Sequence, residues 1–180
     1  MQDWKNRIVV VTGDITDEDC DVIVNAANES LARGGGVCGA IHRAAGPGLA
    51  RACDRIGHCP TGEAVMTGAF DLPCRRVIHA VGPVWGAGGG DLEDELLASC
   101  YTESLRLAAA EGFTSIAIPC ISTGTYGFPP ARACAVALDA LREGLADYPE
   151  ITEVRLVCWL PEDAELYEQA LAAPDTPAGG

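Results

Sequence analysis

Two asparagines and a run of glycines form the part of the sequence best suited to hold a ligand. Asn25 and Asn28 end the apolar run Val22–Val24, and Gly34–Gly36 follows a few residues later. Glycines let the backbone approach a ligand closely and adopt positive φ. The helix expected after them offers unpaired N–H groups and the positive end of its dipole, which suits a phosphate. This stretch therefore predicts a site for a phosphorylated ligand.

The same stretch contains a literal G-x-G-x-x-G, from Gly34 to Gly39, so a dinucleotide-binding (Rossmann) site is an alternative. That fingerprint needs its glycines immediately after the first strand. Here an earlier strand and the segment Ala26–Arg33 come before them. A loop that the glycines merely shape is a second alternative. It is disfavoured because each glycine in regular structure costs about 0.5–1 kcal/mol relative to alanine.

Three polar loops follow apolar runs: Gly13–Thr16, Asn25–Cys38 and Cys120–Pro130. If the strands before them are neighbours that run in the same direction, the loops converge at one end of a sheet. Neither Gly34–Cys38 nor Cys120–Pro130 contains Lys or Arg, so a phosphate here would depend on N–H groups and helix ends. Hydrogen bonds to charged groups contribute roughly 1.5–3 kcal/mol each. Four or five of them can hold a diphosphate without a salt bridge.

These loops need a framework of alternating strands and helices, and the apolar pattern supplies one. This alternation predicts a mixed or largely parallel sheet covered on both faces. The expected strands are Trp4–Thr12, Val22–Asn25, Ala64–Ala69, Arg76–Ala80, Ser115–Pro119 and Val154–Trp159. The expected helices are Val37–Ala45, Pro47–Ile56, Asp91–Glu111, Ala131–Leu145 and Glu162–Leu171.

Composition excludes several classes of protein. The chain has 180 residues, of which 48% are hydrophobic, so one globular domain is expected. The net charge of −14 argues against binding a nucleic-acid polymer, because such affinity comes largely from neutralising phosphates. No apolar run is long enough for a membrane span, and the N-terminus lacks signal-peptide character. Nine cysteines, an odd number without a C-x-x-C pair, indicate a reducing cytoplasm and no zinc site.

Six motifs resemble the macrodomain family, and within it the MacroD-type ADP-ribosyl hydrolases most. They match in order from about Ile8 to Tyr167. They are Gly13-Asp14-Ile15-Thr16, Val24-Asn25-Ala26-Ala27-Asn28, Gly34-Gly35-Gly36-Val37, Ile41-His42-Arg43-Ala44-Ala45-Gly46, His79-Ala80-Val81-Gly82-Pro83-Val84-Trp85 and Ile121-Ser122-Thr123-Gly124-x-Tyr126-Gly127. The resemblance implies a three-layer α/β/α fold with a mixed, largely parallel central sheet. A single macrodomain is expected over residues 1–172, with a disordered tail over 173–180.

The resemblance also implies an ADP-ribose site. Asp14 would accept a hydrogen bond from the adenine amino group, and Trp159 would stack on the base. Asn28 would hold the distal ribose, and His42 would support the site from behind. The expected binding residues are Asp14, Ile15, Asn28, Gly36, Val37, Cys38, Ser122, Thr123, Gly124, Thr125, Tyr126, Phe128 and Trp159, and the expected catalytic residues are Asn28, Cys38 and His42. The alternatives are a helix N-cap for Asp14, loop packing for Phe128, and core positions for Trp159 and His42.

Cys38 departs from the family pattern, because many MacroD-type members have Asp after Gly-Gly-Gly-Val. Three interpretations follow. In the first, hydrolysis continues with a water that the substrate activates and Asn28 positions. In the second, the protein is a reader that binds ADP-ribose without cleaving it. In the third, Cys38, at a helix N-terminus and one turn from His42, acts as a thiolate base or nucleophile.

The first interpretation makes the protein an ADP-ribose-binding hydrolase. It would remove mono-ADP-ribose from modified proteins, at acidic-residue esters first, or deacetylate O-acetyl-ADP-ribose. A non-enzymatic domain for another adenine nucleotide or a nucleic-acid end is a further alternative. We expect a monomer whose partners are ADP-ribose and ADP-ribosylated proteins, with no cofactor, metal or membrane.

Overall fold

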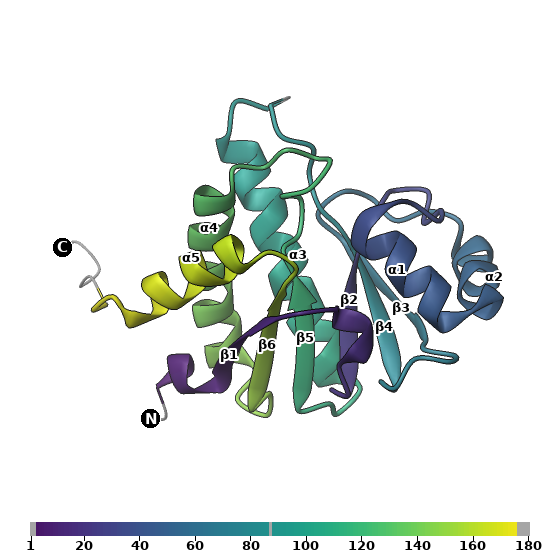
Figure 1. The fold of residues 1–180 in the computed structure, drawn as a ribbon, viewed down its shortest axis with the longest axis horizontal. Helices are drawn as coiled ribbons and strands as arrows, with labels where there is room; N and C mark the ends of the chain where they lie inside the picture. The colour runs from purple at the N-terminus through teal and green to yellow at the C-terminus, as the bar shows by residue number, and fades with distance from the viewer. Residues whose placement is uncertain (1–2, 87, 176–180) are drawn as a thin grey trace.

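A computed structural model describes residues 3–86 and 88–175, and a six-stranded sheet with the order β1-β6-β5-β2-β4-β3 lies at its centre (Figure 1). Every neighbouring pair is parallel except β3–β4, which is antiparallel. The sheet is thus mixed and largely parallel, as predicted. Its strands are β1 Ile8–Thr12, β2 Val22–Ala27, β3 Ala64–Gly68, β4 Arg76–Val81, β5 Ser115–Pro119 and β6 Glu153–Cys158.

Helices cover both faces of the sheet, which gives the expected three layers. Figure 1 shows α1 and α2 grouped apart from α3, α4 and α5. The two hydrophobic clusters agree with this division: Ile23 of β2 belongs to the cluster that contains residues of α1 and α2, whereas Val22 and Val24 belong to the cluster that contains residues of the other three helices. This alternation follows from the pleat of a strand. The helices are α1 Gly36–Ala45, α2 Pro47–Ile56, α3 Asp91–Ala110, α4 Pro130–Asp147 and α5 Pro161–Ala172.

Most expected boundaries lie within one or two residues of those in the structure, and three of the differences affect how the sheet and the site are described. Trp4–Arg7 is a 3-10 turn and not part of β1, because the Asp3 carboxylate accepts the Lys5 N–H at 3.1 Å and starts a turn there. β2 continues two residues beyond Asn25, so Asn25 lies inside the strand. β6 ends at Cys158, which leaves Trp159 just outside the sheet.

The ends of the parallel strands bring the three polar loops to one end of the sheet. β5 and β2 are direct neighbours, and β6 separates β5 from β1.

Among the described residues, no helix is both long and apolar enough to cross a bilayer. The expected tail begins with Ala173–Asp175, which form no helix or strand, and residues 176–180 lie outside the described part of the chain.

Candidate functional site

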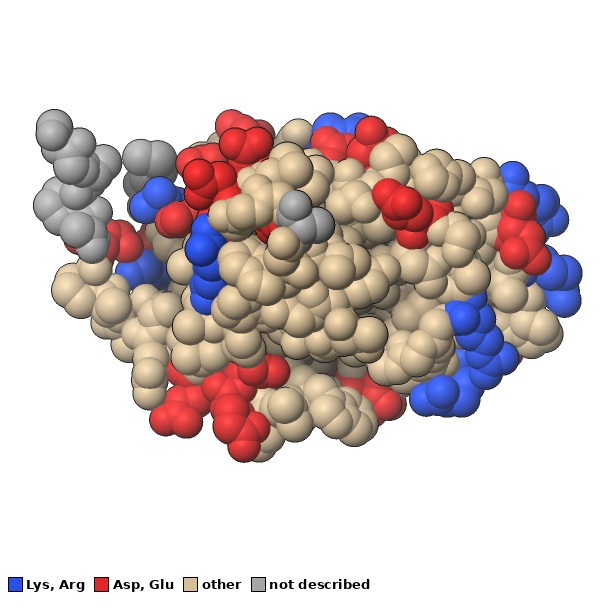
Figure 2. Space-filling view, turned by 90° about the horizontal axis from the view of Figure 1, so that it is seen from above, with Lys and Arg blue, Asp and Glu red and all other residues tan. Residues whose placement is uncertain are grey.

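A cleft of about 310 Å³ lies where the loops after β2 and β5 meet the start of α1. None of the described residues that line it carries a charged side chain. Figure 2 views this end of the molecule, and its centre is formed by uncharged residues with Lys and Arg toward the edge. The predicted residues that line the cleft are Asn28, Gly36, Val37, Cys38, Ser122, Gly124, Thr125 and Tyr126.

One wall of the cleft is the N-terminus of α1. The first backbone hydrogen bond of this helix runs from Gly39 N to Gly35 O at 3.1 Å. The amides of Gly36, Val37 and Cys38 precede it and are therefore the free donors of the first turn. Gly36 has φ +55°, a conformation that favours glycine. This wall offers N–H groups and the helix dipole to an anion.

The glycines of the G-x-G-x-x-G pattern serve this wall and not a Rossmann turn. A Cβ on Gly39 would lie 2.7 Å from the carbonyl oxygen of Gly34. Gly39 therefore lets the loop fold back onto the first turn of α1. The glycines also come after the second strand of the chain, so the dinucleotide interpretation is wrong.

The opposite wall is the loop after β5, which closes on itself through backbone bonds. Gly127 N donates to Gly124 O at 3.0 Å, and Phe128 N donates to Ser122 O at 2.9 Å. Ser122 has φ +66° and is buried, and its hydroxyl has no hydrogen-bond partner in the described protein. A strained residue with an unpaired buried hydroxyl at a cleft wall is a strong candidate for ligand contact.

Asn28 and Cys38 lie at the same end of the cleft and share a partner. The Asn28 side chain donates to Ala32 O at 3.0 Å and accepts from Ala32 N at 3.0 Å and from the Ser30 hydroxyl at 2.9 Å. The Cys38 thiol donates to the same Ala32 O at 3.7 Å. The segment after β2 thus holds both side chains against the glycine loop.

A buried polar row beneath Cys38 fixes the orientation of Asn25. The Thr67 hydroxyl donates to Gly68 O at 3.0 Å and lies 2.9 Å from His79 Nε2. His79 Nδ1 then accepts from Asn25 Nδ2 at 3.0 Å, and the same amide group lies 3.8 Å from Cys38 Sγ. Burial, followed by the charge of His42, lowers the pKa of His79 to about 4. Asn25 therefore ties the site to the sheet through a neutral imidazole.

His42 lies behind the cleft and does not line it. Its ring is buried, and neither nitrogen has a hydrogen-bond partner in the described protein. Burial and then the charge of Arg33 lower the pKa of His42. A neutral imidazole one turn after Cys38 fits the supporting position expected for it.

Asp14 and Ile15 stand on a 3-10 turn, η2 (Ile15–Asp17), beyond the lined part of the cleft. One Asp14 oxygen accepts from Thr16 N at 2.9 Å and from the Thr16 hydroxyl at 2.7 Å, so the N-cap alternative is present. That oxygen is Oδ1 in both bonds. The second carboxylate oxygen keeps its capacity to accept from a ligand.

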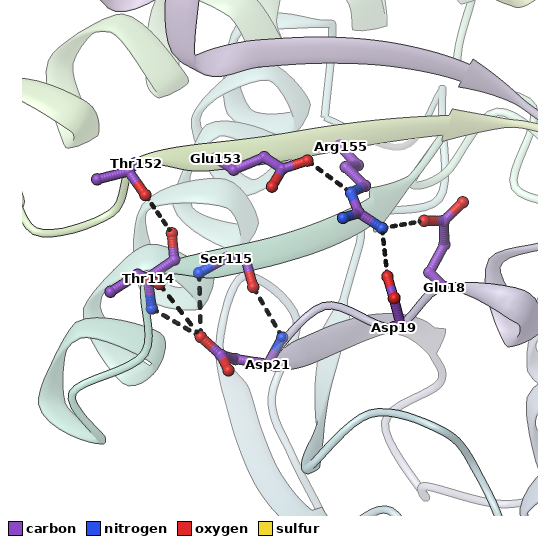
Figure 3. Close-up of polar contacts among 8 residues, drawn as sticks. All are labelled: Glu18, Asp19, Asp21, Thr114, Ser115, Thr152, Glu153 and Arg155. Atoms are coloured by element: carbon purple, nitrogen blue, oxygen red, sulfur yellow. Dashed lines mark hydrogen bonds and ion pairs between the residues drawn. The ribbon is translucent and has the colours of Figure 1, made fainter.

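Arg155 on β6 holds the segment that follows this turn (Figure 3). Its Nη1 lies 2.7 Å from Glu18 and 2.9 Å from Asp19, and its Nε lies 2.7 Å from Glu153. Asp21 continues the attachment by accepting from Thr114 N at 2.9 Å. These contacts fix the turn that carries Asp14 relative to β5 and β6.

The remaining predicted residues divide into one exposed and two packed side chains. Trp159 is 68% exposed, so the core alternative is wrong for it. Phe128 is 1% exposed and its ring centroid lies 4.7 Å from that of Trp85, which is the packing alternative. The Thr123 hydroxyl donates to Cys120 O at 3.1 Å, and Thr123 is not among the residues that line the cleft. Contact of these residues with ADP-ribose stays a prediction.

Several lining residues were absent from the expected set. Gly82 is the most informative, because a Cβ there would lie 2.1 Å from the Ser122 hydroxyl oxygen and 2.6 Å from Ile121 Cγ2. The feature of the sequence that indicates a special backbone position at Gly82 is the Gly-Pro pair at the end of an apolar strand. The others are Ala26, Ala27, Gly34, Gly35, Cys120 and Ile121.

Residues 24–137 match the Macro domain family, which is more than half of the chain. The chain belongs to the macrodomain family. This macrodomain is 53% identical over 171 residues to the O-acetyl-ADP-ribose deacetylase of Escherichia coli (strain K12), with 93% of this chain and 96% of the relative covered. It is 50% identical over 177 residues to the O-acetyl-ADP-ribose deacetylase of Cronobacter sakazakii, with 96% and 98% covered.

Solved macrodomains have the same fold. The Trypanosoma brucei macrodomain in complex with ADP-ribose gives a TM-score of 0.88 at 38% identity, covering 95% of this chain and 72% of that one. The Oceanobacillus iheyensis macrodomain with ADP gives 0.87 at 44% identity, covering 91% and 89%. The three-layer macrodomain fold is therefore confirmed.

Proposed function

We propose that this macrodomain hydrolyses an ester on the distal ribose of ADP-ribose, with O-acetyl-ADP-ribose as its first substrate. The cation-free cleft between the α1 amides and the loop after β5 carries the proposal, because its size and donors suit a diphosphate. The relatives named O-acetyl-ADP-ribose deacetylase favour the acetyl ester. We therefore put the acetyl ester ahead of the protein ester, which the sequence alone ranked first.

In the proposed complex, the amides of Gly36, Val37 and Cys38 bind the diphosphate from one side and the Ser122–Tyr126 loop binds it from the other. Asp14 and Ile15 recognise adenine, and the exposed indole of Trp159 stacks on the base. Asn28 then meets the distal ribose at the opposite end of the cleft. Tyr126 packs beside that ribose.

The reaction is the addition of water to the acyl carbon. The bond between that carbon and the ribose oxygen breaks, the ribose oxygen takes a proton, and the products are ADP-ribose and acetic acid. No carboxylate or imidazole lines the cleft among the described residues. We therefore assign activation of the water to a diphosphate oxygen, with Asn28 positioning the water.

The same lack of a lining carboxylate favours a second candidate, a reader that binds ADP-ribose without cleaving it. Cys38 supplies a thiol where many family members have Asp. A thiol is a weaker hydrogen-bond acceptor than a carboxylate. The reader and the hydrolase share the binding geometry and differ only in turnover.

The deciding experiment incubates the purified protein with O-acetyl-ADP-ribose and, separately, with a protein mono-ADP-ribosylated on an acidic residue. We expect acetate release from the first above a heat-inactivated control. Absence of product from both substrates, together with tight calorimetric binding of ADP-ribose, would replace the hydrolase with the reader.

Variants at Cys38 separate the mechanisms. Cys38→Ala keeps activity when the substrate activates the water, and Cys38→Asp raises kcat by about ten-fold or more if water activation is the slow step. A loss of more than about a hundred-fold in Cys38→Ala, with unchanged affinity for ADP-ribose, would assign the chemistry to the thiol.

We also propose that the protein works as a monomer in the cytoplasm, on free or protein-linked ADP-ribose. All nine cysteines are free thiols, which suits a reducing compartment. Size-exclusion chromatography with light scattering tests the monomer.

A further inference from the structure

A second cavity, of about 610 Å³, opens directly beside the cleft. The two spaces share Asn28, Gly82 and Tyr126. The proposed function places the distal ribose at the Asn28 end of the cleft. A group attached to that ribose therefore reaches the second cavity without leaving the protein.

Apolar side chains from two elements form much of this cavity. Val81, Pro83 and Val84 come from the end of β4 and the residues after it, while Leu92 and Leu96 come from the start of α3. Val84 is 56% exposed and Leu92 is 52% exposed. Covering such side chains with an apolar group is favourable.

Among the described residues that line this cavity, the charged ones are two carboxylates, Glu29 and Glu93. Glu29 accepts from Thr61 N at 3.2 Å and from the Thr61 hydroxyl at 2.8 Å, and these bonds lower its pKa. Glu93 accepts from the amides of Gly88 and Gly90, which lower its pKa as well. Both stay ionised at neutral pH, and no Lys or Arg lines the described part of the cavity. An anionic group is therefore repelled from it.

The shape of the cavity is held by the same contacts. The two bonds of Glu93 fix the turn before α3, and the bond between Glu29 and Thr61 joins the segment after β2 to the one before β3. Arg132 pairs with Asp94 at 2.8 Å and lies 5.0 Å from the centre of the Trp85 ring. A wall fixed before binding loses little freedom when a ligand enters.

We propose that this second cavity takes the acyl chain of the ester and selects uncharged chains longer than acetyl, such as butyryl. The inference rests on the proposed function for the position of the ribose. An acetyl group fills only a small part of about 610 Å³. Each further methylene buried there favours binding about four-fold, so butyryl, with two more methylenes, gains about fifteen-fold over acetyl.

The test compares acetyl, butyryl and succinyl esters of ADP-ribose on the purified protein, each kcat/KM being divided by the rate of hydroxide hydrolysis of that ester. Butyryl and succinyl have the same number of carbons and differ in charge. We expect kcat/KM for butyryl to be about fifteen-fold above acetyl, and kcat/KM for succinyl to be below butyryl by at least ten-fold. Glu29→Gln removes one negative charge from the cavity and should raise the corrected kcat/KM for the succinyl ester relative to that for the butyryl ester.

Leu92→Trp fills the cavity and brings the ratio of butyryl to acetyl to about one. Ile56→Trp is the matched control, because Ile56 is also an exposed apolar helix residue, at 41%, and lies outside both cavities. It should leave the ratio at the wild-type value.

Calorimetry with amide-linked acetyl and butyryl analogues, which resist hydrolysis, measures the same preference as a ratio of Kd values. Equal Kd values together with a corrected kcat/KM ratio of one would overturn this inference and leave the acetyl hydrolase intact. About fifteen-fold tighter binding of the butyryl analogue, without hydrolysis of any ester, would remove the hydrolase and support the cavity assignment.

Discussion

Replacing Ser122 with glycine should stabilise the protein and weaken its binding of ADP-ribose at the same time. Ser122 has φ +66°, and this left-handed conformation costs a non-glycine residue about 1–2 kcal/mol. Its buried hydroxyl has no partner in the described protein, which costs about 1–3 kcal/mol more. The extra chain entropy of glycine removes about 0.5–1 kcal/mol of that gain.

The net stabilisation is therefore about 1–4 kcal/mol, which raises Tm by about 2–16 °C for a chain of this size. Losing one hydrogen bond to a charged ligand weakens binding by about ten-fold or more. Differential scanning calorimetry gives Tm, and titration calorimetry with ADP-ribose gives Kd.

Ser122→Ala is the control, because it removes the hydroxyl and keeps the strained backbone. It should bind as weakly as Ser122→Gly and be less stable than it by about 1 kcal/mol. A glycine variant that melts at or below the wild-type Tm would refute the strain argument. Unchanged affinity in both variants would refute contact between this hydroxyl and the ligand.

Two further predictions concern Asp14 and His79. In Asp14→Asn, Thr16 continues to donate to the side-chain oxygen of the cap, so an NH₂ group replaces the second carboxylate oxygen as the group open to a ligand. We expect the affinity for ADP-ribose to fall by about ten-fold with Tm unchanged. A variant that binds ADP-ribose as tightly as the wild type would exclude adenine recognition by Asp14. His79 has its pKa lowered to about 4, so the unfolded chain binds more protons between pH 4 and 6.5, and stability falls as pH falls through this window. Between pH 7 and 4.5 the wild type should lose about 2–3 kcal/mol more than His79→Gln in urea unfolding, whereas parallel losses would contradict the neutral imidazole.

The fold was predictable because its signals are local. Val22–Val24 and Ser115–Pro119 are short apolar runs followed by polar turns, and the parallel pairing of β2 with β5 brings those turns together. The start of α1 was also predictable, because consecutive glycines before a helix indicate a backbone turn that exposes the first amides of that helix. These signals gave both walls of the cleft.

What the sequence did not show depends on contacts between distant segments. The strained backbone at Ser122 lies in a loop whose residue types do not indicate a positive φ at that position. The need for glycine at position 82 appears only once β4 lies beside that loop. The second cavity combines the segment after β2, the end of β4 and the start of α3, and no single stretch carries its pattern.

The absence of lysine and arginine from the described lining of the cleft has a consequence for ionic strength. A diphosphate is attracted here by short-range dipoles, while the net charge of −14 repels it from a distance. Added salt screens the long-range repulsion, with a Debye length of about 10 Å at 0.1 M, and leaves the contacts at the amides largely intact. Affinity for ADP-ribose should therefore rise with salt, whereas a phosphate site built from arginines loses affinity under the same change.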